Sequence, residues 1–138
     1  MKKSVKASNT HLIKRVRTGI PGFDDLVQGG FPLNSSVLVC GGPGTGKTIF
    51  CLQFLVAGAL KSNEKGLYIT FEQRAEALYK QAIQFGWELS SLEKKGLLKI
   101  ISIPLEKITE KTIKDIQQVV KKEGIKRNHT NTIIKRCI

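Results

Sequence analysis

The sequence predicts an α/β fold in which a parallel β-sheet is flanked by helices. Apolar strand-like runs alternate along the chain with segments whose apolar residues recur at helical spacing. A glycine-rich loop stands at the first strong junction between a strand and a helix. The 138 residues fit one domain, and 41% hydrophobic with 25% charged residues is ordinary globular composition. Disordered and fibrous classes of protein are therefore excluded for the chain as a whole.

The elements before the glycine-rich loop are expected to be short. Residues 1–14 are basic and polar without periodicity, which predicts a flexible arm. A short helix is expected at residues 23–27, followed by a loop at 32–35. The apolar run 37–40 is bounded by turn residues and predicts a strand buried on both faces.

The elements after the loop alternate regularly. The first is a helix that is apolar nearly all round, as in a helix packed deep in a core. Ser90 and Glu93 have the spacing of a capping box and predict a further short helix that ends near Gly96. The longer expected elements are helices at 48–60, 75–85 and 109–123 and strands at 67–71 and 97–103.

The pattern breaks near the C-terminal end of the sequence. A fourth strand is due at Ile125, but residues 126–131 are charged and polar. Central strands of parallel sheets are usually apolar because both of their faces are buried. We therefore expect residues 128–138 to be a polar, basic tail that does not continue the sheet.

The net charge of +12 lies almost entirely at the two ends of the chain. Residues 1–17 carry six basic and no acidic side chains, and residues 121–138 carry six basic and one acidic. A basic face within the fold would favour a nucleic-acid partner more strongly than two basic ends do. Contact with nucleic acid and simple solvation of the ends both remain open.

Targeting and redox signals are weak. The longest nearly apolar run, residues 49–60, falls short of the ~20 residues of a membrane span, and no apolar stretch follows the first basic residues as in a secretory signal. The cysteines and histidines have neither disulfide nor zinc spacing; they are Cys40, Cys51, Cys137, His11 and His129. We expect a cytoplasmic protein that does not enter a membrane.

The glycine-rich loop carries the strongest chemical signal. It fits the phosphate-binding pattern G-x-x-x-x-G-K-[ST], or Walker A motif, at every fixed position between a predicted strand and a predicted helix. Backbone N–H groups of such a loop point at phosphate oxygens, Lys47 would reach the β- and γ-phosphates, and Thr48 would ligate Mg²⁺. An ordinary glycine-rich turn is the alternative. The predicted nucleotide-binding residues are Gly42, Pro43, Gly44, Thr45, Gly46, Lys47 and Thr48.

Glu72 is the second candidate for the site. It follows the second long strand, and ligands of open α/β sheets lie beyond the carboxyl ends of the strands. A carboxylate there could polarise the water that attacks a γ-phosphate. A solvated residue that opens the next helix is the equally open alternative.

These residues resemble the KaiC-like branch of the RecA superfamily of ATPases over residues 15–127. The resemblance implies a RecA-like P-loop NTPase fold that binds ATP with Mg²⁺, with Glu72 as the catalytic carboxylate and assembly into homo-oligomers. Gln73 stands where the family often has a second glutamate. The matching segments are Arg17 to Leu26, Gly41 to Thr48, Phe71 to Glu72 and Phe85 to Leu89.

The resemblance stops after Arg127. There the family continues into an apolar strand that ends in the Walker B aspartate, whereas this chain has Asn128 to Asn131. The resemblance also implies that two strands between the loop strand and the Glu72 strand are absent, so the sheet would lack its middle. A change of reading frame is one hypothesis; an apolar strand ending in aspartate in a shifted frame of the coding DNA would support it.

Three functional hypotheses follow from the sequence. The first is an ATP-binding KaiC-like module, with hydrolysis left open because metal positioning and charge neutralisation supply most of phosphoryl-transfer catalysis. The second is a non-functional remnant that does not fold cooperatively, because unpaired strand edges would be exposed. The third is a basic nucleic-acid-binding or regulatory protein, whose binding would weaken steeply with salt.

Overall fold

The computed structural model describes residues 13–130 and 133–136, with side chains described as far as residue 129. Most of the predicted arm, together with Asn131 and Cys137, lies outside the described residues. The elements are β1 (Arg15–Val16), α1 (Phe23–Leu26), β2 (Phe31–Pro32), β3 (Ser36–Leu38), α2 (Lys47–Ser62), β4 (Gly66–Thr70), α3 (Ala75–Ile83), α4 (Leu89–Lys94), β5 (Leu98–Ser102), a 3₁₀ turn η1 (Leu105–Lys107), α5 (Glu110–Lys122), β6 (Arg127–Thr130) and β7 (Ile133–Arg136).

The central sheet has five strands in the order β3-β7-β6-β4-β5. β4 is parallel to both β5 and β6, and β7 is antiparallel to both β3 and β6. The predicted α/β fold, a parallel sheet flanked by helices, is therefore confirmed, with β7 as an antiparallel insertion. A small second sheet pairs β1 with β2, where the sequence predicted a loop from residue 32.

The expectation that the sheet lacks its middle is wrong. β6 and β7 occupy the two positions between the loop strand β3 and the Glu72 strand β4. Residues 128–130 and 133–136 therefore belong to the sheet, although we expected a tail that does not continue it. The polar strand β6 can be buried because its side chains have partners, as the contacts of Arg127 and His129 show.

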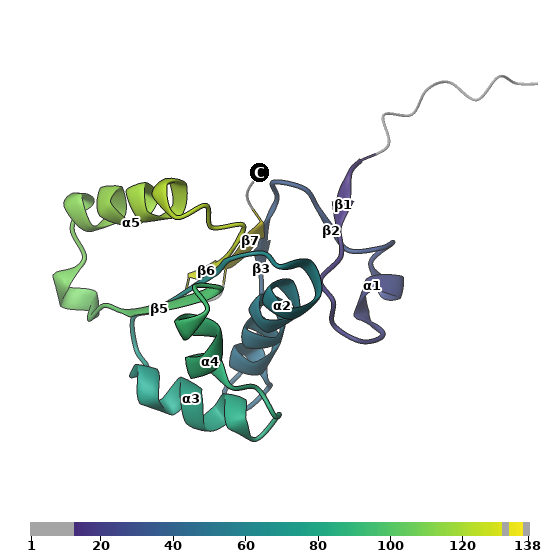
Figure 1. Cartoon of the computed structure of the whole chain (residues 1–138), viewed down its shortest axis with the longest axis horizontal. Coiled ribbons are helices and arrows are strands. Elements are labelled where there is room, and N and C mark those ends of the chain that lie inside the picture. Colours follow the sequence, from purple (N-terminus) through teal and green to yellow (C-terminus); the bar gives the residue numbers. More distant parts are fainter. Residues whose placement is uncertain (1–12, 131–132, 137–138) are drawn as a thin grey trace, which may run out of the picture.

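Helices cover both faces of the sheet (Figure 1). α2, α3 and α4 lie on one face, where buried residues of α2 pack against Tyr68 and Leu98. α5 lies on the other face, where Ile116 and Val120 pack on Leu67 and Ile69. Successive side chains of β4 point to opposite faces of the sheet, as the pleat requires, and all five residues of the strand are buried.

Two local predictions need correction. The strand predicted at residues 37–40 is not buried on both faces, because Leu38 of β3 is 62% exposed. α4 begins at Leu89 with Glu88 at its N-cap, so Ser90 and Glu93 do not form the predicted capping box. The capping box of the structure is instead at α5, where the Thr109 hydroxyl accepts from the Thr112 backbone N–H. In the described part of the chain, no helix combines the length and the apolar character that a membrane span requires.

Candidate functional site

The Gly41–Thr48 loop joins the carboxyl end of β3 to the first turn of α2. Gly44 and Gly46 have φ angles of 74° and 86°, in the left-handed region that glycine adopts without steric cost. The helix begins directly afterwards, and the backbone N–H of Phe50 donates to the carbonyl of Gly46 at 2.9 Å. The glycines therefore make a tight, exposed curve that ends at a helix N-terminus, where anions are favoured.

Lys47 and Thr45 bond to the loop itself. The Lys47 Nζ donates to the carbonyl oxygen of Gly41 at 2.5 Å, and the Thr45 hydroxyl donates to the carbonyl oxygen of Gly42 at 2.8 Å. Both bonds are solvent-exposed. The Lys47 ammonium group thus lies over the loop, and an exposed bond to a carbonyl is easily exchanged for a bond to a phosphate oxygen.

A pocket of about 540 Å³ connects the loop to the end of β4. Pro43, Gly44, Lys47 and Thr48 line it from the loop side. The other lining residues are Tyr68, Ile69, Thr70, Glu72 and Gln73 at the end of β4, and His129 on β6. The structure therefore brings Glu72 into one pocket with Lys47 and Thr48, on the carboxyl edge of the sheet.

The turn that carries Glu72 is fixed by two hydrogen bonds. The backbone N–H of Gln73 donates to the Thr70 hydroxyl at 3.0 Å, and the Ser102 hydroxyl donates to the Gln73 carbonyl at 3.2 Å. Glu72 itself is exposed. The two hydrogen bonds fix the backbone of the turn, and the Glu72 carboxylate remains accessible to water in the pocket. A general base needs that access.

His129 and Tyr68 form the back of this pocket. They are paired residues of β6 and β4, their ring centroids are 4.3 Å apart, and His129 is only 2% exposed. Burial raises the pKa of Tyr68 above its ordinary value, while a hydrogen bond with the Thr48 side chain acts in the opposite direction. The neutral Tyr68 hydroxyl therefore contacts the residue that the sequence predicts as the Mg²⁺ ligand.

Sequence reasoning missed the place of His129 in the site. It weighed this histidine only as a zinc ligand, and the polar residues around it argued against a strand. Among the described side chains, no group of three or more histidine, cysteine or acidic residues could hold a metal ion. Thr48 is the predicted Mg²⁺ ligand in this pocket, and few protein ligands are usual for an ion that commonly binds through one or two side chains and substrate phosphates.

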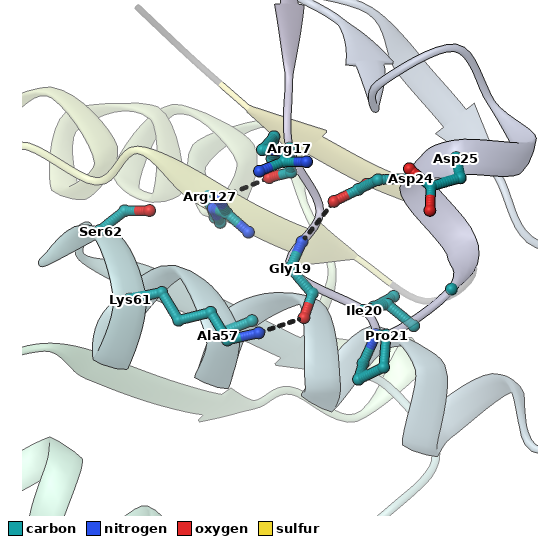
Figure 2. Close-up of a pocket in the computed structure, with 11 residues that line it drawn as sticks. Arg17, Gly19, Ile20, Pro21, Asp24, Asp25, Ala57, Lys61, Ser62 and Arg127 are labelled. Carbon is teal, nitrogen blue, oxygen red and sulfur yellow. Dashed lines mark hydrogen bonds between the residues drawn. The ribbon is translucent and has the colours of Figure 1, made fainter.

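A second cavity, of about 410 Å³, lies at the C-terminal end of α2 (Figure 2). One wall is the segment from Arg17 to Asp25, which contains part of the family-like stretch before the loop. The Lys61 Nζ donates to the carbonyl oxygen of Gly19 at 2.8 Å across this cavity. At this cavity a hydrogen bond therefore joins the N-terminal segment to α2, the helix that follows the phosphate-binding loop.

Arg127, the first residue of β6, also lines this second cavity. Its guanidinium donates to the carbonyl oxygens of Arg17, Thr18 and Phe54 at 2.9 to 3.0 Å. Its Nε donates to the Glu64 carboxylate at 2.6 Å, and the side chain is 3% exposed. A Cβ at Gly58 would stand 2.5 Å from Nε of Arg127, so only glycine leaves room for the guanidinium on α2.

Asp24 organises the turn before α1. Its Oδ1 accepts from the backbone N–H and the hydroxyl of Thr18, at 2.8 and 2.7 Å, and its Oδ2 accepts from the N–H of Gly19. Burial alone would raise the pKa of Asp24, but these hydrogen bonds and the nearby charge of Arg17 together lower it below the ordinary value.

The lowered pKa of Asp24 predicts a pH-dependent contribution to stability. A carboxyl group whose pKa falls on folding stabilises the protein above its unfolded pKa of about 3.9, and the effect is lost as pH falls through the folded pKa. We expect Asp24→Asn to lower the unfolding free energy by about 1.5–3 kcal/mol at pH 7, and the difference from wild type to shrink below pH 4. Urea unfolding at both pH values measures this, and a difference independent of pH would contradict it.

Comparison with known proteins identifies the family. The family model "ATPase: KaiC" matches residues 16–137. A UPF0273 protein of Thermotoga maritima is 38% identical over 136 residues, which cover 92% of this chain and 55% of that protein. The circadian clock oscillator protein KaiC of Synechococcus elongatus is 44% identical over 94 residues, which cover 68% of this chain and 18% of that protein.

A solved structure has the same fold. The crystal structure of a KaiC-like protein from Pyrococcus horikoshii superposes with a TM-score of 0.75 and 40% sequence identity. The match covers 84% of this chain and 52% of that protein. The chain therefore spans about half the length, or less, of the relatives it matches.

Proposed function

The chain belongs to the KaiC family of ATPases, and we propose that it binds ATP with Mg²⁺ through its Gly41–Thr48 loop. The observation that supports this most is the shape of the loop. The loop has two left-handed glycines, Gly44 and Gly46, and an ammonium group over it, and Gly44, Lys47 and the first turn of the helix line one pocket. These groups complement a polyphosphate chain.

The loop residues and Glu72 have proposed roles. Backbone N–H groups of residues 42–46 bind phosphate oxygens, Lys47 neutralises their charge, and the Thr48 hydroxyl turns from Tyr68 toward the metal ion. Mg²⁺, when bound, supplies further neutralisation of the phosphate oxygens. Glu72 orients and polarises a water molecule in the same pocket.

Hydrolysis by this chain alone is proposed to be slow. Among the described residues that line the pocket, Glu72 is the only carboxylate, and the side chain presented by the neighbouring strand β6 is His129. Phosphoryl transfer depends on the positioning of the metal and on charge neutralisation by several groups. Binding is therefore the primary activity. Assembly into oligomers, by the family likeness, and a cytoplasmic location, as the sequence predicts, are parts of the same proposal.

Equilibrium binding of a fluorescent ATP analogue to the purified chain tests this function. We expect saturable binding in the presence of Mg²⁺, and competition by unlabelled ATP. The basic nucleic-acid-binding alternative is distinguished by a separate titration with duplex DNA, whose affinity for the chain should weaken steeply with salt, by a slope of about 0.9 per phosphate contact. No saturable binding at millimolar nucleotide would overturn the proposal.

Glu72→Gln is expected to separate binding from hydrolysis. Glu72 is exposed, and the structure shows no bond from it to the loop among the described side chains, so the affinity for ATP should change by no more than about twofold. The rate of phosphate release should be about 100-fold lower in Glu72→Gln than in the wild type, which is the lower end of the range for loss of a general base. An unchanged rate of phosphate release would show that Glu72 is not the base.

A further inference from the structure

The connections that lead into β4, β5 and β6 meet at the amino edge of the sheet, the edge opposite the phosphate-binding loop. The backbone N–H of Gly66 donates to the Leu97 carbonyl at 2.9 Å, and the N–H of Lys126 donates to the Lys65 carbonyl at 2.9 Å. Gly66 is the register partner of both Leu98 and Arg127. Because neighbouring strands lie about 4.8 Å apart, the starts of these three strands span about 10 Å.

Lysines stand on all three connections. None of their ammonium groups has a hydrogen bond or an ion pair with another described side chain or carbonyl, and five of the six side chains are exposed while Lys126 is half-buried. The set, called here the amino-edge lysines, is Lys65 before β4, Lys94 and Lys95 before β5, and Lys121, Lys122 and Lys126 before β6.

The acidic residues of the same connections already have partners. Glu64 bonds to Arg127 at 2.6 Å, and Glu123 bonds to Lys99 at 2.6 Å. Glu93 accepts a hydrogen bond from the Tyr79 hydroxyl. Two of the three carboxylates are thus neutralised by cations outside the set, so the amino-edge lysines leave a net positive surface.

We propose that the amino-edge lysines bind the phosphate backbone of nucleic acid. The sequence places the basic excess at the chain ends, but the fold brings Lys126 directly beside Lys65, and it starts β5, β4 and β6, each preceded by lysines, at adjacent positions of the sheet. The result is a basic face built into the domain, which is the electrostatic footprint of a nucleic-acid-binding surface. Flexible lysine side chains, in the last turns of α4 and α5 and on the connections that follow α2, α4 and α5, suit contacts with regularly spaced phosphates that read no base sequence.

Fluorescence anisotropy of a labelled DNA duplex of about 20 base pairs, titrated with the full chain at several KCl concentrations, tests the proposal. The edge variant is Lys65→Gln, Lys95→Gln and Lys126→Gln combined. Its matched control removes the same charge elsewhere on the surface, by Lys80→Gln, Lys111→Gln and Lys114→Gln combined. Thermal melts verify that both variants are folded.

We expect the wild type to bind DNA with a steep salt dependence, and the edge variant to lose about tenfold or more in affinity at low salt. The slope of log affinity against log salt should fall by about 0.9 for each lost contact, while the control keeps the wild-type slope. Lys47→Ala should bind DNA as the wild type does, which separates this surface from the nucleotide site. Absence of salt-dependent binding, or equal losses in the edge and control variants, would overturn the proposal.

Discussion

Replacing Arg127 with methionine is expected to lower the free energy of unfolding by about 3–5 kcal/mol, as the removal of one partner from a buried ion pair does. The guanidinium is buried and bonds to Glu64 and to three backbone carbonyls. Its carbon also lies 4.6 Å from the centroid of the Phe54 ring. Methionine would remove the guanidinium from the Glu64 carboxylate, whose side chain is only 15% exposed.

Urea unfolding of the variant measures this loss, and Lys126→Met is the matched control. Lys126 precedes Arg127 and its side chain has no bond to a described residue, so its replacement should change stability by no more than about 0.5 kcal/mol. Adding Glu64→Gln to Arg127→Met should cost less than Glu64→Gln does in the wild type, because the pair is already broken. A loss below about 1 kcal/mol for Arg127→Met would contradict the role of this side chain.

Lys47→Ala is expected to weaken ATP binding by about 2–3 kcal/mol, which is roughly 30- to 150-fold in the dissociation constant. The reason is that its ammonium group is the cation of the loop, held in the apo protein by an exposed bond to Gly41. The fold should be unaffected, because that bond contributes little in water. Calorimetric titration with Mg²⁺-ATP measures the change.

Lys61→Ala is the matched control for this variant. Lys61 lies on the same helix, α2, and its ammonium group also donates to a carbonyl, that of Gly19 at 2.8 Å. It lines the cavity at the other end of the helix, away from the phosphate-binding loop. Its replacement should therefore leave the affinity for ATP unchanged, and equal losses in both variants would show that the loop lysine has no special role.

Local chemistry made one part of the structure predictable from the sequence. The glycines at 44 and 46 and the apolar run that follows required a tight loop and a buried helix, and α2 extends from Lys47 to Ser62. The apolar residues at 67–71 predicted β4, which the structure places at 66–70. The position of Glu72 in the loop pocket followed from the rule that strand ends meet at one edge.

The polar strand β6 was not predictable in the same way. Polar residues such as Arg127 and His129 argue against a buried strand. They are buried here because residues far away in the sequence provide their hydrogen bonds and contacts. Those partners include the carbonyl oxygens of Thr18 and Phe54, the Glu64 carboxylate and the Tyr68 ring. Gly58, within an otherwise apolar helix, was the one local sign that α2 leaves space for another group. A single sequence does not say which group fills it.

The pairing of β3 with β7 also bears on whether the chain is a functional unit. We expected the loop strand to have an unpaired edge facing the missing middle of the sheet, which was the main physical argument for a non-functional remnant. Val37 is instead the register partner of Ile134, and Val37 and Val39 pack against the main core cluster. The loop is therefore anchored on a paired strand and on the most buried helix of the fold.

A thermal melt of the purified chain with and without Mg²⁺-ATP, beside Lys47→Ala, tests the central claim most directly. That claim is that this chain folds as a unit and presents a nucleotide-binding loop. We predict a cooperative transition that gains about 2.7 kcal/mol of stability with nucleotide at roughly 100 times its dissociation constant, and no comparable gain for Lys47→Ala. A chain without a cooperative transition, or with one that nucleotide does not move, would contradict the account.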